Sequence, residues 1–289
     1  MLKTNEDRLV KVSVLGEVSS PVMRYPYRIS VKGEPMVLPG VGGIRYNVRV
    51  GDPAVGWMAD HVEPGVSIKV SDVNANMALN ILSCIGNEAI VVSGDAKGSK
   101  GVVIGKHGGI EHVIVDFTPD VLDKLVIGDK VLVKAYGVGL KILNLPEVRV
   151  MNIDPKLLKL MDLKIVEGFL EVPVTHLVPA SIMGSGLGAV QTYSGDYDIQ
   201  LFDEETVKKY HLEDLRLGDL VAIMNAEHTY GRIYRSGAVS IGVVVHTDCV
   251  MAGHGPGVTT IMTSGSGKIK PRIDPEANIA KLLNLRDDI

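Results

Sequence analysis

Residues 241–263 read IGVVVHTDCVMAGHGPGVTTIMT, two apolar runs rich in β-branched residues on either side of a polar loop. The first run ends at His246 and the second begins at Val258, so the pattern predicts two buried strands joined by that loop. His246, Asp248, Cys249 and His254 fall within nine residues of one another. Loops held by strands are where proteins commonly place binding and catalytic groups, so the stretch predicts a functional site on a β scaffold.

Short apolar runs separated by Gly, Pro and Asp turns continue along the rest of the chain. The pattern predicts strands at 11–18, 27–31, 44–50, 90–92, 102–104, 112–117, 131–135, 170–175, 198–202, 220–224 and 239–246. Helical spacing predicts short helices at 74–85, 119–125, 155–161, 204–211 and 276–285. Many short strands with few helices favour a barrel or sandwich over a doubly wound sheet. We therefore predict a mainly β (α+β) fold with β-barrel or sandwich-like halves.

An internal echo supports a two-part organisation. LDKLVIGDKVLV at 122–133 resembles LEDLRLGDLVAI at 212–223, each a helical turn, a Gly-Asp turn and a strand. Gly-Asp before a strand is also common turn chemistry in unrelated segments. Residues 150–170 look like a connection, so we predict an N-terminal β-rich half over 1–150 and a C-terminal β-rich half with a terminal helix over 151–289.

Composition narrows the class of protein. The 289 residues are 46% apolar and 22% charged, with a net charge of −4 and no Lys/Arg block, which disfavours nucleic-acid binding. The N-terminus lacks a signal-peptide core, and no apolar stretch reaches the roughly 18 residues of a membrane span. Two cysteines, Cys84 and Cys249, make no disulfide framework. We expect a reduced, cytoplasmic protein without a membrane partner.

The 246–254 loop carries the catalytic prediction. His246, Asp248 and His254 combine imidazoles and a carboxylate, a set suited to proton transfer or to a divalent metal ion. The alternative is a hydrogen-bonded pair of loop histidines. Cys249 fits a nucleophile beside a histidine base, but a small buried apolar residue is the favoured interpretation.

A second polar loop contains Asp60, His61 and Glu63, and it again combines carboxylates with an imidazole. EPGVS at 63–67 echoes GPGVT at 255–259, so we expect the two loops to share one pocket. That hypothesis requires His61 and His254 to lie close together in the fold.

Glycine-rich loops supply the other predicted ligand-binding residues. These are Asp95, Lys97, His107, Gly184, Ser185, Gly255 and Gly257. For Asp95, Lys97 and His107 the alternative is a hairpin with polar ends. Residues 184–189 formally fit a dinucleotide fingerprint, but no suitable strand and helix flank them, so we expect only a ligand loop with Asp196 and Asp198 nearby. Glu227 and His228 are expected at the surface.

Five motifs in this chain resemble an uncharacterised family of bacterial and archaeal proteins, a domain of unknown function with N- and C-terminal parts. They are ADHVEPG at 59–65, GDAKG at 94–98, KHGG at 106–109, MGSG at 183–186 and GHGPG at 253–257. The resemblance spans nearly the whole chain and implies no activity. The chain is also loosely similar to acetamidase/formamidase-like β-rich hydrolases, and no residue role is taken from that similarity.

Two functional hypotheses follow from the sequence. The first is a metal-assisted hydrolase of a small polar or C–N-bonded substrate, with His246 or His254 as general base and Asp248 orienting it or binding the metal. The second is a non-catalytic protein that binds a small ligand or assembles into an oligomer. In both, exposed strand edges favour a homo-oligomer.

Overall fold

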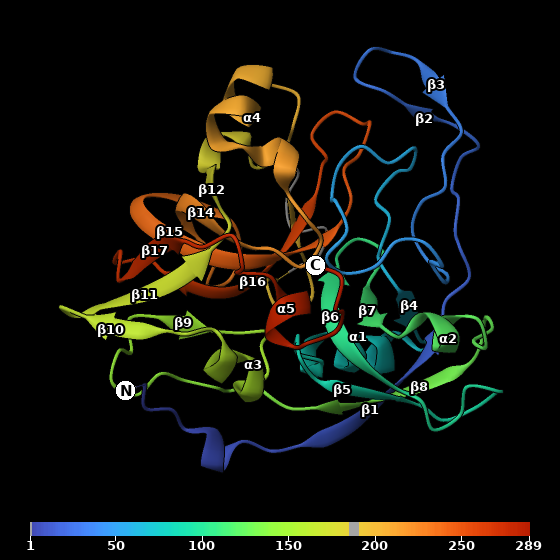
Figure 1. Ribbon diagram of the computed structural model, residues 1–289, viewed down its shortest axis with the longest axis horizontal. Helices are drawn as coiled ribbons and strands as arrows, with labels where there is room; N and C mark the ends of the chain where they lie inside the picture. The colour runs from blue at the N-terminus through green and yellow to red at the C-terminus, as the bar shows by residue number, and fades with distance from the viewer. Residues whose placement is uncertain (1, 185–190) are drawn as a thin grey trace.

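The computed structural model describes residues 2–184 and 191–289 (Figure 1). The fold is mainly β, as predicted, with short helices at α1 (Val73–Leu82), α2 (Pro119–Leu122), α3 (Pro155–Leu160), α4 (Glu204–Tyr210) and α5 (Ile279–Leu282). Single 3₁₀ turns lie at Glu6–Arg8, Ala180–Ile182 and Leu212–Asp214. All five predicted helices are present in shorter form.

The first half of the chain closes into a six-stranded antiparallel barrel. Its strands are β1 (Val12–Val18), β4 (Val66–Lys69), β5 (Glu88–Val91), β6 (Lys100–His107), β7 (His112–Asp116) and β8 (Lys130–Ala135). They pair in the order β1-β4-β7-β6-β5-β8, and β1 pairs with β8 to close the ring. Alternating apolar side chains fill the interior, including Val18, Ile68, Val91, Val103, Val115 and Val133.

The second half contains two further sheets. A larger sheet runs β12-β14-β15-β16-β13, with β9 on β16, and a smaller one runs β10-β11-β17. Their bounds are β9 (Arg149–Val150), β10 (Lys164–Val166), β11 (Phe169–Val174), β12 (His176–Pro179), β13 (Tyr197–Asp198), β14 (Leu220–Glu227), β15 (Ile233–His246), β16 (Gly257–Ser264) and β17 (Ile269–Ile273). The opening stretch of the sequence is therefore the end of β15, a loop, and β16, as predicted.

Barrel and larger sheet meet where β6 crosses β15 and β16. Gly105 in β6 has no Cβ, and one added there would lie 2.5 Å from Val245 Cγ1 of β15. Thr259 Oγ1 of β16 accepts from the Lys106 amide at 3.3 Å and donates to the Lys106 carbonyl at 3.0 Å. The end of β6 at His107 is thereby fixed beside the facing ends of β15 and β16.

The sequence echo corresponds to a shared turn. Gly128 and Gly218 have φ values of 90° and 88°, and each following Asp caps its own turn. Asp129 Oδ2 accepts the Val126 amide at 3.0 Å, and Asp219 Oδ2 accepts the Arg216 amide at 2.9 Å. Both turns lead into a strand, β8 in the barrel and β14 in the larger sheet.

Three predicted elements differ in the structure. Of the strand predicted at 198–202, only Asp198 lies in a strand, β13, and Ile199 makes a single bridge. Residues 44–50 make one bridge, Ile44 to Val66, rather than a strand. The apolar side chains alternate there because Val48 and Val50 are buried in two different cores, and not because the segment pairs with a strand. The C-terminal helix begins at Ile279 rather than 276, because Asn278 caps it by accepting the Ala280 amide at 2.8 Å.

A two-stranded hairpin, β2 (Arg28–Ile29) and β3 (Pro35–Met36), projects from the body as the blue loop at the upper right of Figure 1. Its Val31 amide donates to the Val250 carbonyl at 2.9 Å, so the hairpin touches the loop after β15. Within residues 2–184 and 191–289, no helix has the length and apolar character needed to cross a membrane. The expected homo-oligomer stays a prediction.

Candidate functional site

Four imidazoles meet where the barrel joins the larger sheet. His107 ends β6, His246 ends β15, His61 lies in the loop before β4, and His254 lies in the loop before β16. The ring centroids of His107 and His246 are 4.3 Å apart, and those of His61 lie 5.0 Å from both His246 and His254. His61 Nε2 and His254 Nδ1 are 3.2 Å apart, so the two loops do share one site.

Two carboxylates complete the group. Asp196 Oδ2 lies 2.8 Å from His246 Nε2, and Asp198 Oδ2 lies 2.8 Å from His254 Nδ1. Asp198 is also 3.6 Å from both His246 Nε2 and His61 Nε2. The sequence placed both aspartates near a ligand loop but gave neither of them a role in the site. Their signal in the sequence is the Asp-x-Asp spacing, which places both carboxylates on one face of an extended segment.

Hydrogen bonds outside the group set the orientation of two imidazoles. His246 Nδ1 lies 2.9 Å from the Thr247 carbonyl, which only accepts, so this nitrogen carries the proton. His107 Nδ1 likewise donates to Glu63 Oε1 at 2.7 Å. In a neutral ring the Nε2 atom then has a lone pair. His246 Nε2 faces the two aspartates, which is the orientation that metal-binding histidines adopt.

The electrostatics of the site call for positive charge between the carboxylates. Burial alone would raise the pKa of Asp198, but hydrogen bonds to His246, His254 and His61 hold it well below its usual range. Burial lowers the pKa of His246, and its hydrogen bonds to Asp196 and Asp198 more than reverse this, raising the pKa to about 9. Buried carboxylates are stable only beside a cation, either imidazolium or a metal ion.

Two overlapping groups of side chains could hold a metal ion. His107, Asp196 and His246 form one, and His61, Asp198 and His246 form the other. Within each set the ligand atoms lie within 4.8 Å of one another. Nitrogen and oxygen ligands on one zinc ion lie roughly 3.4 Å apart, so a small inward movement would bring either set to bonding distance.

Glu63 supports the site from the barrel side. It is fully buried and accepts the Gly42 amide at 2.8 Å and the Ser67 hydroxyl at 2.5 Å, besides the His107 ring. Its Oε1 also lies 2.9 Å from His112 Nδ1, a histidine that the sequence did not single out. Burial raises the pKa of Glu63, but the two histidines hold it well below its usual value, so the carboxylate stays ionised. Glu63 therefore orients His107 and does not face the aspartates.

Lys106 and its partners hold the segment that carries the aspartates. Its buried ammonium donates to the Tyr193 carbonyl at 2.7 Å and to Asn152 Oδ1 at 2.8 Å. The Gly108 amide donates to Asp196 Oδ1 at 2.6 Å. The end of β6 thus supplies one site histidine, the anchor of the 191–194 turn and a backbone donor to Asp196.

Comparison with known proteins places the chain in a family. Models described as domain of unknown function DUF4438, N-terminal and C-terminal, match residues 27–159 and 160–283. The chain belongs to the DUF4438 family. A solved relative, described as the crystal structure of TM1086, is 52% identical, with 96% of this chain and 98% of that chain covered and a TM-score of 0.92. No curated protein matches.

The glycines predicted for ligand binding have packing roles in this DUF4438 protein. A Cβ on Gly257 would overlap His246 Nε2 and Asp196 Oδ2, and one on Gly255 would overlap the Ile199 carbonyl. A Cβ on Gly184 would overlap the Gly253 carbonyl. Gly255 and Gly257 therefore let the 196–199 segment approach the histidines closely, and Gly184 lets the chain pass close to Gly253. Ser185 lies outside the described residues.

Three predicted site residues lie apart from the imidazoles. Asp95 and Lys97 are exposed in the turn that enters β6, whereas His107 ends this strand. Eight strand residues span roughly 23 Å, so the two ends are far apart. Asp248 accepts the Gly56 amide at 3.2 Å, whereas the carboxylate that lies 2.8 Å from His246 Nε2 is that of Asp196. Asp248 was predicted as the partner of His246 because it lies two residues away in the sequence. Asp196 takes that place because it directly precedes β13, which pairs with β16 next to the end of β15.

Cys249 is buried, as favoured from the sequence, but its surroundings are polar. Its Sγ lies 2.8 Å from Asp60 Oδ1, and Asp60 also forms an ion pair with Arg28 at 2.7 Å. Burial raises the pKa of the Cys249 thiol, which does not favour a thiolate nucleophile. Asp60 and His61 therefore connect the imidazole group to the cysteine.

Proposed function

We propose that the protein holds a divalent transition-metal ion between His107, His246 and His61, with Asp196 and Asp198 as oxygen ligands, and uses it to hydrolyse a small polar substrate. The main support for a metal site is the orientation of the His246 ring. Its Nδ1 donates outward to a carbonyl, while its Nε2 lies 2.8 Å from a buried carboxylate oxygen. Without a metal, the raised pKa of His246 supplies that oxygen with an Nε2–H donor, and a metal ion between the two atoms would take the place of this proton.

The ligand chemistry supports zinc or a similar ion. Imidazole and carboxylate together suit Zn²⁺ and neighbouring divalent ions, whereas Mg²⁺ and Ca²⁺ favour all-oxygen sets. An ion of this kind lowers the pKa of a bound water and polarises a substrate carbonyl. The chain's own residues would orient the ion through Glu63 and Thr247 and balance its charge through the two aspartates.

His254 is placed to contact the substrate. Its side chain is 31% exposed, whereas those of His246 and Asp196 are nearly inaccessible, so the open side of the site lies at His254. Its Nδ1 is held by Asp198 at 2.8 Å. A positioned imidazole at the rim of a metal site suits proton transfer to a leaving group, such as the amine released from a C–N bond.

Metal analysis and activity together test the proposal. Protein purified without chelators should contain stoichiometric metal. His246→Ala and His107→Ala should lose it, while removal of an exposed histidine outside the site, His211→Asn, should leave it unchanged. A screen of small amides and related C–N-bonded substrates should then show turnover that His254→Ala abolishes with the metal retained. Metal without turnover would favour a binding protein, and wild-type protein that binds no metal would overturn the proposal.

A further inference from the structure

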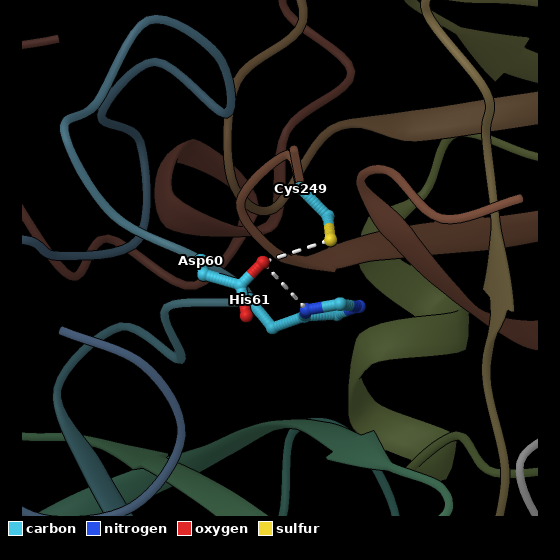
Figure 2. A group of neighbouring side chains, drawn as sticks. All are labelled: Asp60, His61 and Cys249. Atoms are coloured by element: carbon cyan, nitrogen blue, oxygen red, sulfur yellow. Dashed lines mark hydrogen bonds and ion pairs between the residues drawn. The ribbon is translucent and has the colours of Figure 1, made fainter. Parts of the chain in front are cut away.

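A second ligand set lies on the other side of His61. Asp60 Oδ1, a nitrogen of His61 and Cys249 Sγ come from two loops far apart in the chain, and the three ligand atoms lie within 4.8 Å of one another (Figure 2). Asp60 and Cys249 are buried, and the His61 side chain is only 12% exposed. The set combines one oxygen, one nitrogen and one sulfur atom.

The two nitrogens of His61 face different groups. Nε2 lies 3.6 Å from Asp198 Oδ2 and 3.2 Å from His254, within the imidazole group. Nδ1 lies 3.4 Å from Asp60 Oδ1, beyond ordinary hydrogen-bond distances for nitrogen and oxygen. The ring therefore stands between the first ligand set and the second, with one nitrogen turned to each.

The backbone holds these side chains in place. His61 has a φ of 54°, an uncommon conformation for a residue with a side chain. Its amide donates to the Asp248 carbonyl at 3.1 Å, and the Asp60 amide donates to the Pro39 carbonyl at 2.9 Å. A left-handed conformation is energetically costly for a non-glycine residue, so the surrounding structure must maintain it, and such residues are frequent at functional sites.

The surroundings of the sulfur and of Asp60 fit a cation. The Met251 amide donates to Cys249 Sγ at 3.2 Å, so the sulfur already accepts a hydrogen bond, as a thiolate ligand would. Arg28 Nε lies beside Asp60 Oδ2 and leaves Oδ1 directed at His61 and Cys249. A carboxylate and a thiolate would supply two negative charges, which match a divalent ion, while Arg28 stays paired with Asp60 Oδ2.

We propose that Asp60, His61 and Cys249 form a second cation position for a sulfur-tolerant divalent ion such as Zn²⁺ or Co²⁺, with the His61 ring joining it to the first ion. The inference rests on the proposed function, because it uses His61 as a ligand of both ions. Binding there displaces the thiol proton and the remaining imidazole proton to solvent, and forms metal–sulfur and metal–nitrogen bonds. The thiolate disfavours Mg²⁺ and Ca²⁺.

Cobalt titration tests the second position through its sulfur ligand. Metal-free full-length protein titrated with Co²⁺ should bind two equivalents that survive desalting, and a thiolate-to-cobalt charge-transfer band should appear in the near ultraviolet. Cys249→Ser should lose the band and one equivalent. The matched control is Cys84→Ala. The chain has only two cysteines, so a band that survives this control comes from Cys249 even where Cys249→Ser fails to fold.

The outcomes separate the two proposals. Two equivalents with a band that persists in Cys84→Ala support both. One equivalent without a band overturns the second position and leaves the first ion standing. A band that disappears in Cys84→Ala, or persists in Cys249→Ser, also overturns the second position. No retained cobalt overturns both.

Discussion

At the scale of single residues, the site depends on which atom of each imidazole is already engaged. In His246 and His107, Nδ1 donates to an acceptor outside the four imidazoles, and this hydrogen bond directs Nε2 into the site. Gly257 matters for the same reason, because only a missing Cβ lets β16 pass the paired His246 and Asp196. Hydrogen-bond direction and side-chain volume therefore decide what the site can bind.

Gly257→Ala should abolish metal binding with little loss of fold. Gly257 is not in the left-handed region, so alanine adds no backbone strain, and the damage is confined to the overlap with His246 and Asp196. Isothermal titration with Zn²⁺ measures the loss, and circular dichroism checks the fold. Gly98→Ala, in an open turn with φ of 91°, is the control and should bind normally. Wild-type affinity in Gly257→Ala would contradict the assignment.

His228 should make stability depend on acid pH. It was expected at the surface but is fully buried, with Nδ1 3.0 Å from Thr260 Oγ1. Burial lowers its pKa from 6.5 to about 3, so between these values the unfolded chain binds a proton that the folded chain does not. Stability is therefore present above pH 6.5 and is lost as the pH falls.

His228→Asn removes this titration and tests it directly. From pH 6.5 to pH 5 the wild type should lose on the order of 2 kcal/mol more unfolding free energy than the variant, at about 1.4 kcal/mol per pH unit. Urea unfolding at the two pH values measures the difference. Equal losses in both proteins would show that His228 does not carry the effect.

At the scale of elements, the site is made where strands end. His107 ends β6, His246 ends β15, and Asp198 ends the two-residue strand β13, which pairs with β16 through Asp198 and Gly257. The two halves are held in register at the same place, because β6 packs on β15 through Gly105 and on β16 through Thr259. Strand pairing gives the site a rigidity that its loops alone would lack.

Gly105→Ala should destabilise this junction by about 1–3 kcal/mol, because the new methyl group would lie 2.5 Å from Val245 Cγ1. Val245→Ala removes Cγ1, the nearest atom that the new methyl group would strike. The double variant should therefore lose less unfolding free energy than the sum of the losses in the two single variants. Urea unfolding of the four proteins completes the cycle. Additive losses would mean that the two residues do not meet in the folded protein.

At the scale of the whole molecule, the site is a joint product of both halves. His61 and His107 come from the N-terminal half, whereas Asp196, Asp198 and His246 come from the C-terminal half. One apolar core also includes residues of both, among them Ile104 and Ile114 of the barrel and Ile241 and Val245 of the sheet. Ligand binding and the association of the halves should therefore be coupled.

Zn²⁺ should stabilise the entire chain against heat. Free ion at 100 times the dissociation constant adds about 2.7 kcal/mol to the unfolding free energy, which raises the midpoint by several degrees in a chain of this size. Differential scanning calorimetry should show one transition that moves as a unit. His246→Ala is the control and should not move. A shift in only part of a divided transition would contradict coupling between the halves.

Much of the fold could be predicted from the sequence, because its signals are local. The β-branched runs specified most strands, Asp154 before Pro155 marks a helix start, and the Gly-Asp turns at 128 and 218 have the same geometry. The cap at Asn278 was missed, so the last helix was predicted to begin three residues early. The segment 44–50 was mispredicted, since alternation reports burial and not strand pairing. For the site, the loops at 61 and 254 were expected to meet, and they do.

The sequence by itself determined the β-rich class, the positions of the helices and the two loops that carry His61 and His254. Only the tertiary structure decided which carboxylate faces His246, that Asp95 and Lys97 lie at the far end of β6, and that Cys249 meets Asp60. The physical reason is range. Strand and turn preferences act over a few neighbouring residues, whereas the partners in this site are fixed by packing between strands more than a hundred residues apart, such as β6 and β16.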